Sequence, residues 1–322
     1  MSLILQCLRE PVLGIKWQWL FNQRWPAYHE WFLKQGDHHR PKYLTCERQL
    51  RTHMPELMPT YERLVELSGG SDQAARFLSL YCPTPYFAGC SQAVWTRGEP
   101  QLIRNYDYNP LLWDAILLHS AWNGRRVIAM TDCLWGALDG INESGLAVSL
   151  AFGGKRIVGE GFGMPLILRY ILETCETAKQ AQQVLTRVPS HMAYNVTVLD
   201  AQGAHVTVMI SPGCEPMISR SQLATNHQEQ VEWQEHARVT ATLDRAHFLS
   251  LRLQDEEETS ERFQSRFQMP PLYQTKFAEG WGTLYTAIYT PRHNSATFRW
   301  PGYEYATSID EFADTALSIN IL

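Results

Sequence analysis

The sequence predicts an α+β fold, because strands and helices are expected in separate runs along the chain. Near the N-terminus, apolar residues recur at helical spacing in three segments, 26–33, 55–67 and 72–81. Short apolar runs bounded by turn residues then predict strands at 116–120, 126–131 and 146–151. Two helices are expected at 165–175 and 178–187. Strands return at 194–200, 205–210 and 222–226. Two stacked antiparallel sheets between helical layers fit this order.

The C-terminal third is expected to contain one long helix and a final pair of strands. The helix covers 235–253, and the acidic run Asp255-Glu256-Glu257-Glu258 after it predicts a solvated loop. Strands at 283–290 and 295–300 then close the chain. Earlier, Asn142 and Gly145 are placed for the turn of a hairpin at 139–145.

Composition excludes several classes of protein. The chain has 322 residues, 45% of them hydrophobic and 19% charged, which is ordinary for a folded protein of one or two domains. With a net charge of −5, no nucleic-acid partner is expected. No window holds the roughly eighteen apolar residues of a membrane span.

The cysteines and the N-terminus favour the cytoplasm. Seven cysteines are an odd number, they are scattered, and no Cys-x-x-Cys occurs, so neither a disulfide framework nor a zinc site is predicted. The first ten residues have no basic region and no long apolar run, unlike a secretory signal. A reducing compartment would keep a reactive thiol available.

The segment from Tyr86 to Asn109 carries the chemistry. It predicts a strand at 92–95, a turn at 98–100 and a second strand at 101–106. Such a hairpin brings its outer ends together and would place Cys90 beside Arg104 and Asp107. A fixed cation lowers the pKa of a neighbouring thiol, and the thiolate is the nucleophile.

Gly89 and Cys90 together can support self-cleavage. Glycine tolerates a distorted backbone, and the Cys90 thiol could attack the Gly89 carbonyl, form a thioester and lose residues 1–89 to water. Cys90 would then carry a free α-amine, whose ordinary pKa of about 7.7–8.0 suits a general base. The alternative is a buried structural cysteine.

Gly89-Cys90-Ser91 followed by Arg104-Asn105-Tyr106-Asp107-Tyr108 resembles the N-terminal nucleophile hydrolases. The similarity is to the isopenicillin N acyltransferase type, that is acyl-CoA:6-aminopenicillanic acid acyltransferase, and more distantly to the choloylglycine hydrolases. The resemblance implies a four-layer αββα sandwich at 90–322 and a helical propeptide at 1–89, cut off at the cysteine.

Two further blocks match this resemblance. The block at 139–148 resembles a hairpin of the bile salt hydrolase relatives, and a few residues later the backbone N–H of Ala151 matches an oxyanion-hole position. Thr225-Asn226-His227 resembles a strand end whose asparagine donates to the oxyanion. A neutral amide donor suits that task, although Asn226 could simply be a turn residue.

A third block lies in the predicted helix 235–253. Relatives carry a helical arginine close to the nucleophile, and Arg245 is the candidate. Asp244 departs from the Ser or Asn that usually precedes this arginine. His227 is interpreted as structural, because the N-terminal amine makes a histidine base unnecessary.

The sequence therefore predicts a self-processing cysteine amidohydrolase or acyltransferase acting on a linear amide. Cys90 is the nucleophile, Arg104 stabilises its thiolate, and Asp107 holds the amine or the Cys90 backbone. A small amide is the expected substrate, with acyl-CoA as an acyl source if transfer occurs, and no cofactor or metal is expected. Residues 1–89 could stay bound after cleavage. Two alternatives remain: an uncleaved, inactive binding protein, and a Cys90–His227 hydrolase without processing.

Overall fold

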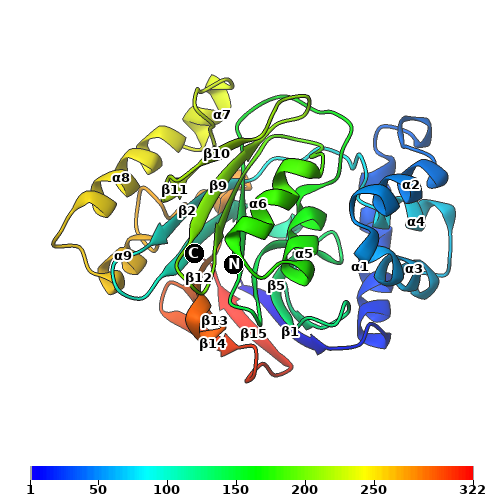
Figure 1. The fold of residues 1–322 in the computed structure, drawn as a ribbon, viewed down its shortest axis with the longest axis horizontal. Helices are drawn as coiled ribbons and strands as arrows, with labels where there is room; N and C mark the ends of the chain where they lie inside the picture. The colour runs from blue at the N-terminus through cyan, green and yellow to red at the C-terminus, as the bar shows by residue number, and fades with distance from the viewer. Residues whose placement is uncertain (1, 322) are drawn as a thin grey trace.

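The computed structural model describes residues 2–321 and places two β-sheets face to face (Figure 1). The larger sheet has nine strands, in the order β10 (Met217–Ser219), β9 (His205–Ile210), β8 (Tyr194–Leu199), β7 (Ala147–Phe152), β6 (Gly136–Asn142), β5 (Val127–Asp132), β4 (Ile116–Ser120), β1 (Ser2–Glu10) and β15 (Thr315–Asn320). The smaller sheet has six, in the order β11 (Leu223–Ala224), β2 (Gly89–Trp95), β3 (Gln101–Tyr108), β12 (Gly282–Thr290), β13 (Ser295–Trp300) and β14 (Tyr303–Ser308). The predicted α+β class with two sheets is confirmed.

Helices cover the outer faces of both sheets (Figure 1). α5 (Met164–Thr174) and α6 (Ala178–Arg187) pack on the nine-stranded sheet, and α7 (Gln234–Val239) contacts α8 (Thr242–Gln254), which packs on β2 and β11. α9 (Ser260–Arg266) adds Phe263 to a second apolar cluster, where it joins Leu249 of α8 and Ile103 of β3. The β2–β3 hairpin therefore belongs to the smaller sheet, with one face of β2 packed on β7 and β8 of the larger sheet and α8 packed on the other.

The N-terminal helices form a separate group at one side of the sheets (Figure 1). They are α1 (Ile15–Leu33), α2 (Tyr43–His53), α3 (Met58–Leu67) and α4 (Asp72–Leu78). Trp17, Phe21 and Phe77 from this group belong to the main apolar core, so the helices are packed onto the rest of the protein. Short 3-10 turns lie at Asp37–His39, Pro55–Leu57, Pro110–Leu112, Phe277–Glu279 and Pro291–His293.

The prediction that 1–89 is only helical was wrong. β1 pairs in parallel with β4 and antiparallel with β15, so the first strand lies inside the large sheet next to the last one. Leu5 and Cys7 are fully buried at alternate positions, as expected for a strand with one face in the core. The parallel β1–β4 pair also makes this sheet mixed, whereas we predicted antiparallel sheets.

The C-terminal predictions need three corrections. β14 and β15 follow the two strands that were expected to close the chain. The predicted helix 235–253 is divided into α7 and α8, because Ala241 adopts a left-handed conformation (φ 48°) that interrupts the helix. The strand expected at 222–226 is only the two residues of β11, which leaves Asn226 in the following loop.

No helix within residues 2–321 combines the length and apolar character needed to cross a lipid bilayer.

Candidate active site

The β2–β3 hairpin forms as predicted and sets the positions of Arg104 and Asp107 relative to Cys90. In the register, Gly89 lies opposite Asp107 and Cys90 lies opposite Tyr106. Gly98 in the connecting turn has a φ of 87°, which glycine adopts without strain. β2 is buried along its whole length, because one face packs on β7 and β8 and the other packs under α8.

Three polar groups of Cys90 each have one partner. The Arg104 Nη2 donates to the Cys90 sulfur at 3.0 Å. The backbone N–H of Cys90 donates to Asn226 Oδ1 at 2.9 Å, and its carbonyl accepts from Arg245 Nη1 at 2.7 Å. Side chains from three distant parts of the chain therefore hold one buried cysteine.

Arg245 connects the other members of the cluster. From the first turn of α8 it also donates to Asn226 Oδ1 at 2.7 Å and to Asp107 Oδ2 at 3.3 Å. The second oxygen of Asp107 accepts from the Thr283 hydroxyl at 2.6 Å. The sequence predicted that Asp107 holds the amine or backbone of Cys90, but within residues 2–321 no hydrogen bond joins the two directly. Hydrogen bonds connect Asp107 to Cys90 through Arg245, which donates to both.

The amide of Asn226 has a defined orientation. Its oxygen accepts from Arg245 and from the Cys90 N–H, so its nitrogen faces the other way. That nitrogen donates to the Phe152 carbonyl at 3.0 Å and to the Ala88 carbonyl at 3.4 Å. Asn226 thus contacts the chain on both sides of the Gly89–Cys90 bond.

Sequence reasoning missed the residue that holds Arg104. Arg104 Nη1 donates to Asp139 Oδ2 at 2.5 Å in a fully buried ion pair. Tyr285 donates to the same oxygen at 2.5 Å, and Tyr289 donates to Asp139 Oδ1. Asp139 is the first residue of the block 139–148, which was interpreted as a hairpin turn. A buried arginine needs an acidic partner, so the lack of one for Arg104 in the smaller sheet was the signal that could have pointed to Asp139.

The expectation of a lowered thiol pKa is wrong for the continuous chain. Burial raises the pKa of the Cys90 thiol and outweighs the lowering by Arg104 and Arg245, while Asp107 raises it further. Burial likewise raises the pKa of Asp107, against the lowering by Arg245 and Thr283. The uncleaved chain therefore holds Cys90 mainly as a thiol.

Ala151 and His227 lie outside the network around Cys90. Ala151 is buried in β7 opposite Asn195, and no hydrogen bond between described residues joins it to Cys90 or Asn226. β7 contacts the site one residue later, through the Phe152 carbonyl. The His227 ring lies 3.0 Å from the Thr242 hydroxyl and 3.2 Å from that of Thr225, which fits the structural role predicted for it.

Gly89 is covered by an aromatic side chain. A Cβ at this position would lie 2.7 Å from Trp281 Cη2 and 3.2 Å from the Asp107 Cβ. Just upstream, the Phe87 ring packs at 5.1 Å against the rings of both Phe152 and Trp233. The segment directly before Cys90 is therefore tightly packed against the site.

We expect Gly89→Ala to slow cleavage after residue 89 at least tenfold and to lower the free energy of unfolding by about 1–3 kcal/mol, because the added methyl overlaps Trp281. Mass spectrometry over time and urea unfolding measure the two effects. Gly14→Ala is the matched control, since its Cβ would meet only ordinary contacts at 3.6 and 3.8 Å. Trp281→Ala should relieve the defect of Gly89→Ala. Unchanged cleavage in the single variant would contradict this packing.

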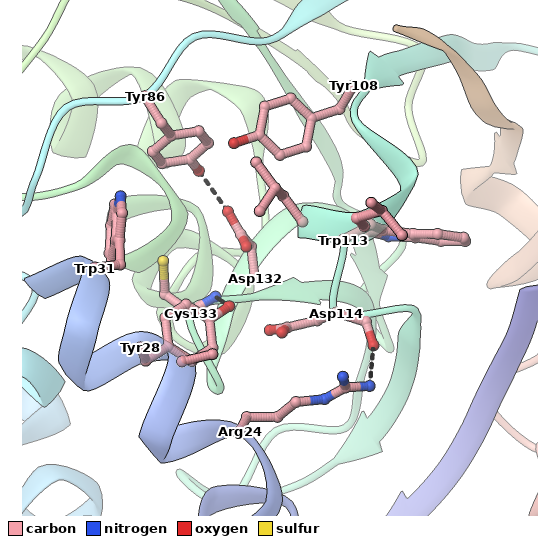
Figure 2. Close-up of a pocket in the computed structure, with 12 residues that line it drawn as sticks. Arg24, Tyr28, Trp31, Tyr86, Tyr108, Trp113, Asp114, Asp132 and Cys133 are labelled. Carbon is pink, nitrogen blue, oxygen red and sulfur yellow. Dashed lines mark hydrogen bonds between the residues drawn. The ribbon is translucent and has the colours of Figure 1, made fainter. Parts of the chain in front are cut away.

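A cavity of about 170 Å³ lies beside the site, between α1 and the segments that follow β3 and β5 (Figure 2). Its walls are mainly aromatic, and two acidic residues, Asp114 and Asp132, face it. The Tyr86 hydroxyl donates to Asp132 Oδ2, and the Leu134 N–H donates to Asp114 Oδ2 at 3.3 Å. Burial, followed by the charge of Asp114, raises the pKa of Asp132 to about 7.

This pKa predicts how stability changes with pH. An unfolded aspartate titrates near pH 3.9, so between about pH 4 and 7 the folded chain binds a proton at Asp132 that the unfolded chain does not. The Asp132 contribution therefore favours folding at low pH and is lost as pH rises to 7. We expect Asp132→Asn to be more stable than wild type by roughly 2–4 kcal/mol at pH 8, with a much smaller gain at pH 4, in urea unfolding. Asp310→Asn, at the surface, is the control, and identical pH profiles for wild type and Asp132→Asn would refute the prediction.

Comparison with known proteins identifies the class of this chain. The family model described as acyl-coenzyme A:6-aminopenicillanic acid acyl-transferase matches residues 95–304. The match spans more than half of the chain, and the chain therefore belongs to this family of amide hydrolases and acyltransferases. The predicted resemblance is confirmed at this level. Cys90 lies just outside the matched range.

Three solved structures illustrate which known folds resemble this chain. Penicillin V acylase from Agrobacterium tumefaciens is 13% identical, over 67% of this chain and 84% of its own, with a TM-score of 0.43. An N-acylethanolamine-hydrolyzing acid amidase ortholog from Caenorhabditis elegans is 15% identical, over 72% and 100%, at 0.48. A mutant conjugated bile acid hydrolase from Clostridium perfringens is 10% identical, over 72% and 96%, at 0.41. No curated protein matches the chain significantly.

Proposed function

We propose that this protein is a self-processing amidohydrolase or acyltransferase in which Cys90 is the nucleophile. The observation that carries the proposal is the convergence on Cys90 of Arg104 at its sulfur, Asn226 at its nitrogen and Arg245 at its carbonyl. A structural cysteine needs no such set of charged and amide partners, and buried charges are costly unless they serve a purpose.

Processing begins at the bond that precedes Cys90. The Cys90 thiol gives up its proton as its sulfur adds to the Gly89 carbonyl, the C–N bond breaks, and a thioester joins Gly89 to the Cys90 sulfur. The thiol proton ends on the released α-amine. Water then hydrolyses the thioester, giving a Gly89 carboxylate and a free thiol. We infer that the Asn226 amide nitrogen, which donates to the neighbouring Ala88 carbonyl at 3.4 Å, turns to the Gly89 oxygen as charge develops there.

After cleavage, Cys90 keeps its hydrogen bonds to Asn226 and Arg245. The new α-amine remains beside Asn226 Oδ1, and Arg245 remains on the Cys90 carbonyl. Displacement of the last residues before Cys90, with the rest of 1–89 still bound, uncovers the thiol, and the amine becomes its general base. A substrate amide then takes the place of the Gly89 carbonyl. Cys90 receives the acyl group, the amine product leaves, and water or a second amine resolves the thioester.

Residues 1–89 are proposed to stay bound after cleavage as a small subunit. β1 has partners on both sides in the nine-stranded sheet, and α1 and α4 contribute to the main core. Dissociation would expose that apolar surface and both neighbouring strands. The two fragments should therefore separate only under denaturing conditions.

The alternative of a Cys90–His227 hydrolase has no support in the geometry, since the His227 ring contacts Thr225 and Thr242.

Alkylation distinguishes the proposed enzyme from the other alternative, an uncleaved and inactive binding protein. Wild type is incubated with and without iodoacetamide and with a panel of N-acyl anilides, and the site of alkylation is mapped. Labelling at Cys90 with parallel loss of amide cleavage supports the proposal. Full amide cleavage by protein alkylated at Cys90 would overturn it.

A further inference from the structure

The cavity of about 170 Å³ is built from both sides of the Gly89–Cys90 bond. Its walls from the N-terminal part are Arg24, Ala27, Tyr28, Trp31 and Tyr86. Its walls from the C-terminal part are Tyr108, Leu111, Leu112, Trp113, Asp114, Asp132 and Cys133. A small subunit that stays bound would therefore supply five of the twelve residues that line this cavity.

Two buried carboxyl groups face the cavity without a direct ion pair to a residue that the structure describes, although the charge of Arg24 acts on Asp114. Asp114 and Asp132 are 4% and 7% exposed, and neither forms an ion pair with a described residue. The nearby Arg24 donates to the backbone carbonyl of Asp114, at 3.3 Å (Figure 2). Their hydrogen bonds come from neutral groups, the Tyr86 hydroxyl and the Leu134 N–H. Burying a carboxylate without a counter-charge is unfavourable, so a cationic ligand would relieve an existing cost.

Aromatic rings surround the same space. The rings of Trp31 and Tyr86 are 6.0 Å apart, those of Tyr86 and Tyr108 are 5.8 Å apart, and those of Tyr28 and Trp31 are 6.1 Å apart. Figure 2 shows these side chains around Asp132. Aromatic faces attract cations, and the effect is largest where water is excluded.

The cavity lies close to the proposed nucleophile. Tyr86 is four residues before Cys90, and the Tyr108 ring is 5.8 Å from that of Tyr106, which pairs with Cys90 across the hairpin. A group held against Asp132 is thus separated from the Cys90 strand by one layer of tyrosine side chains.

We propose that this cavity binds the ammonium group of a small organic cation, held by Asp114 and Asp132 between the aromatic rings, with residues 1–89 supplying one wall. Where that ammonium belongs to the amide substrate, the proposal rests on the function proposed above. Binding of a free ammonium compound does not depend on it. The volume fits a short alkyl or aryl chain, and Leu111 and Leu112, 78% and 61% exposed, give its rim apolar contacts.

Affinity should rise with pH between about 6 and 8, because Asp132 gains its charge there while an alkylammonium keeps its own. Other ionisable groups are close to Asp132 from every neighbouring element. They are Arg24 and Tyr28 of α1, Tyr86 before β2, Tyr106 and Tyr108 of β3, Asp114, Cys133, and Tyr194 of β8. The pKa values of the five tyrosines and of Cys133 are raised, so these groups stay neutral over this range.

The test uses full-length Cys90→Ala protein, so that it is independent of cleavage and catalysis. Calorimetry at pH 8 compares n-butylammonium with 1-butanol, which has similar size and no charge. We expect binding of the ammonium only, weakened at least tenfold by Asp132→Asn and by Asp114→Asn, and unchanged by the surface control Asp310→Asn. Far-UV circular dichroism and thermal unfolding verify that each variant is folded.

The same measurement contains the results that would overturn the proposal. They are equal binding of n-butylammonium and 1-butanol, no binding of either, or undiminished binding by both aspartate variants. If one of the aspartate variants fails to fold, two results decide the question. They are the binding by the other variant and the expected rise, from pH 6 to 8, in the affinity of Cys90→Ala protein for n-butylammonium. Ammonium binding together with an inert Cys90 would leave this site standing and refute only the proposed chemistry.

Discussion

Cys90→Ala protein is expected to remain a single chain of 322 residues, whereas wild type separates into two under denaturing conditions. The substitution removes the sulfur that adds to the Gly89 carbonyl, and no other described nucleophile has the same contacts with Arg104 and Asn226. Loss of a catalytic nucleophile typically lowers rates a thousandfold or more. Denaturing electrophoresis and intact mass follow the result.

Two variants make this prediction specific. Cys214→Ala removes an exposed free thiol and should process at the wild-type rate. Cys90→Ser keeps a weaker nucleophile and should process slowly. Cleavage of the Cys90→Ala chain at residue 89 would assign the reaction to another group or to a contaminating protease.

Arg245→Met should both destabilise the protein and abolish processing. The side chain is fully buried and donates to Cys90, Ser91, Asn226 and Asp107. Removing one member of a buried ion pair leaves the other charge uncompensated, which costs about 3–5 kcal/mol. Urea unfolding measures the stability, and mass spectrometry of the same sample measures cleavage.

A double variant separates the two effects of Arg245. Asp107→Asn in the Arg245→Met background removes the stranded charge and should recover part of the stability without recovering cleavage. Arg126→Met is the matched control, because Arg126 pairs with Glu143 and Asp310 at the surface, and such pairs contribute at most about 1 kcal/mol. Normal processing by Arg245→Met would exclude the residue from the site.

The sequence was informative where local pattern and chemistry coincide. The hairpin and its register follow from two short strands with a glycine turn, and the contact between Arg104 and Cys90 follows from that register. Asn226 and Arg245, by contrast, were assigned to the site only from the family resemblance, since no local pattern specifies which loop or helix lies over a given strand.

Several features depend on contacts between distant residues and were missed for that reason. β1 is stabilised by β15, about three hundred residues away, so its strand signal had no nearby partner to support it. Asp139 was assigned to a turn because its role requires knowing that Arg104 faces the other sheet. The predicted lowering of the Cys90 thiol pKa was wrong, because the sequence indicates neighbouring charges but not the extent of burial, which raises this pKa.

N-terminal sequencing of the large fragment, from a preparation that cleaves amides, tests the central claim most directly. The account predicts a sequence beginning Cys-Ser-Gln-Ala, from Cys90, with residues 1–89 recovered in equal amount from the same native particle. An active preparation in which the Gly89–Cys90 bond is intact would contradict it.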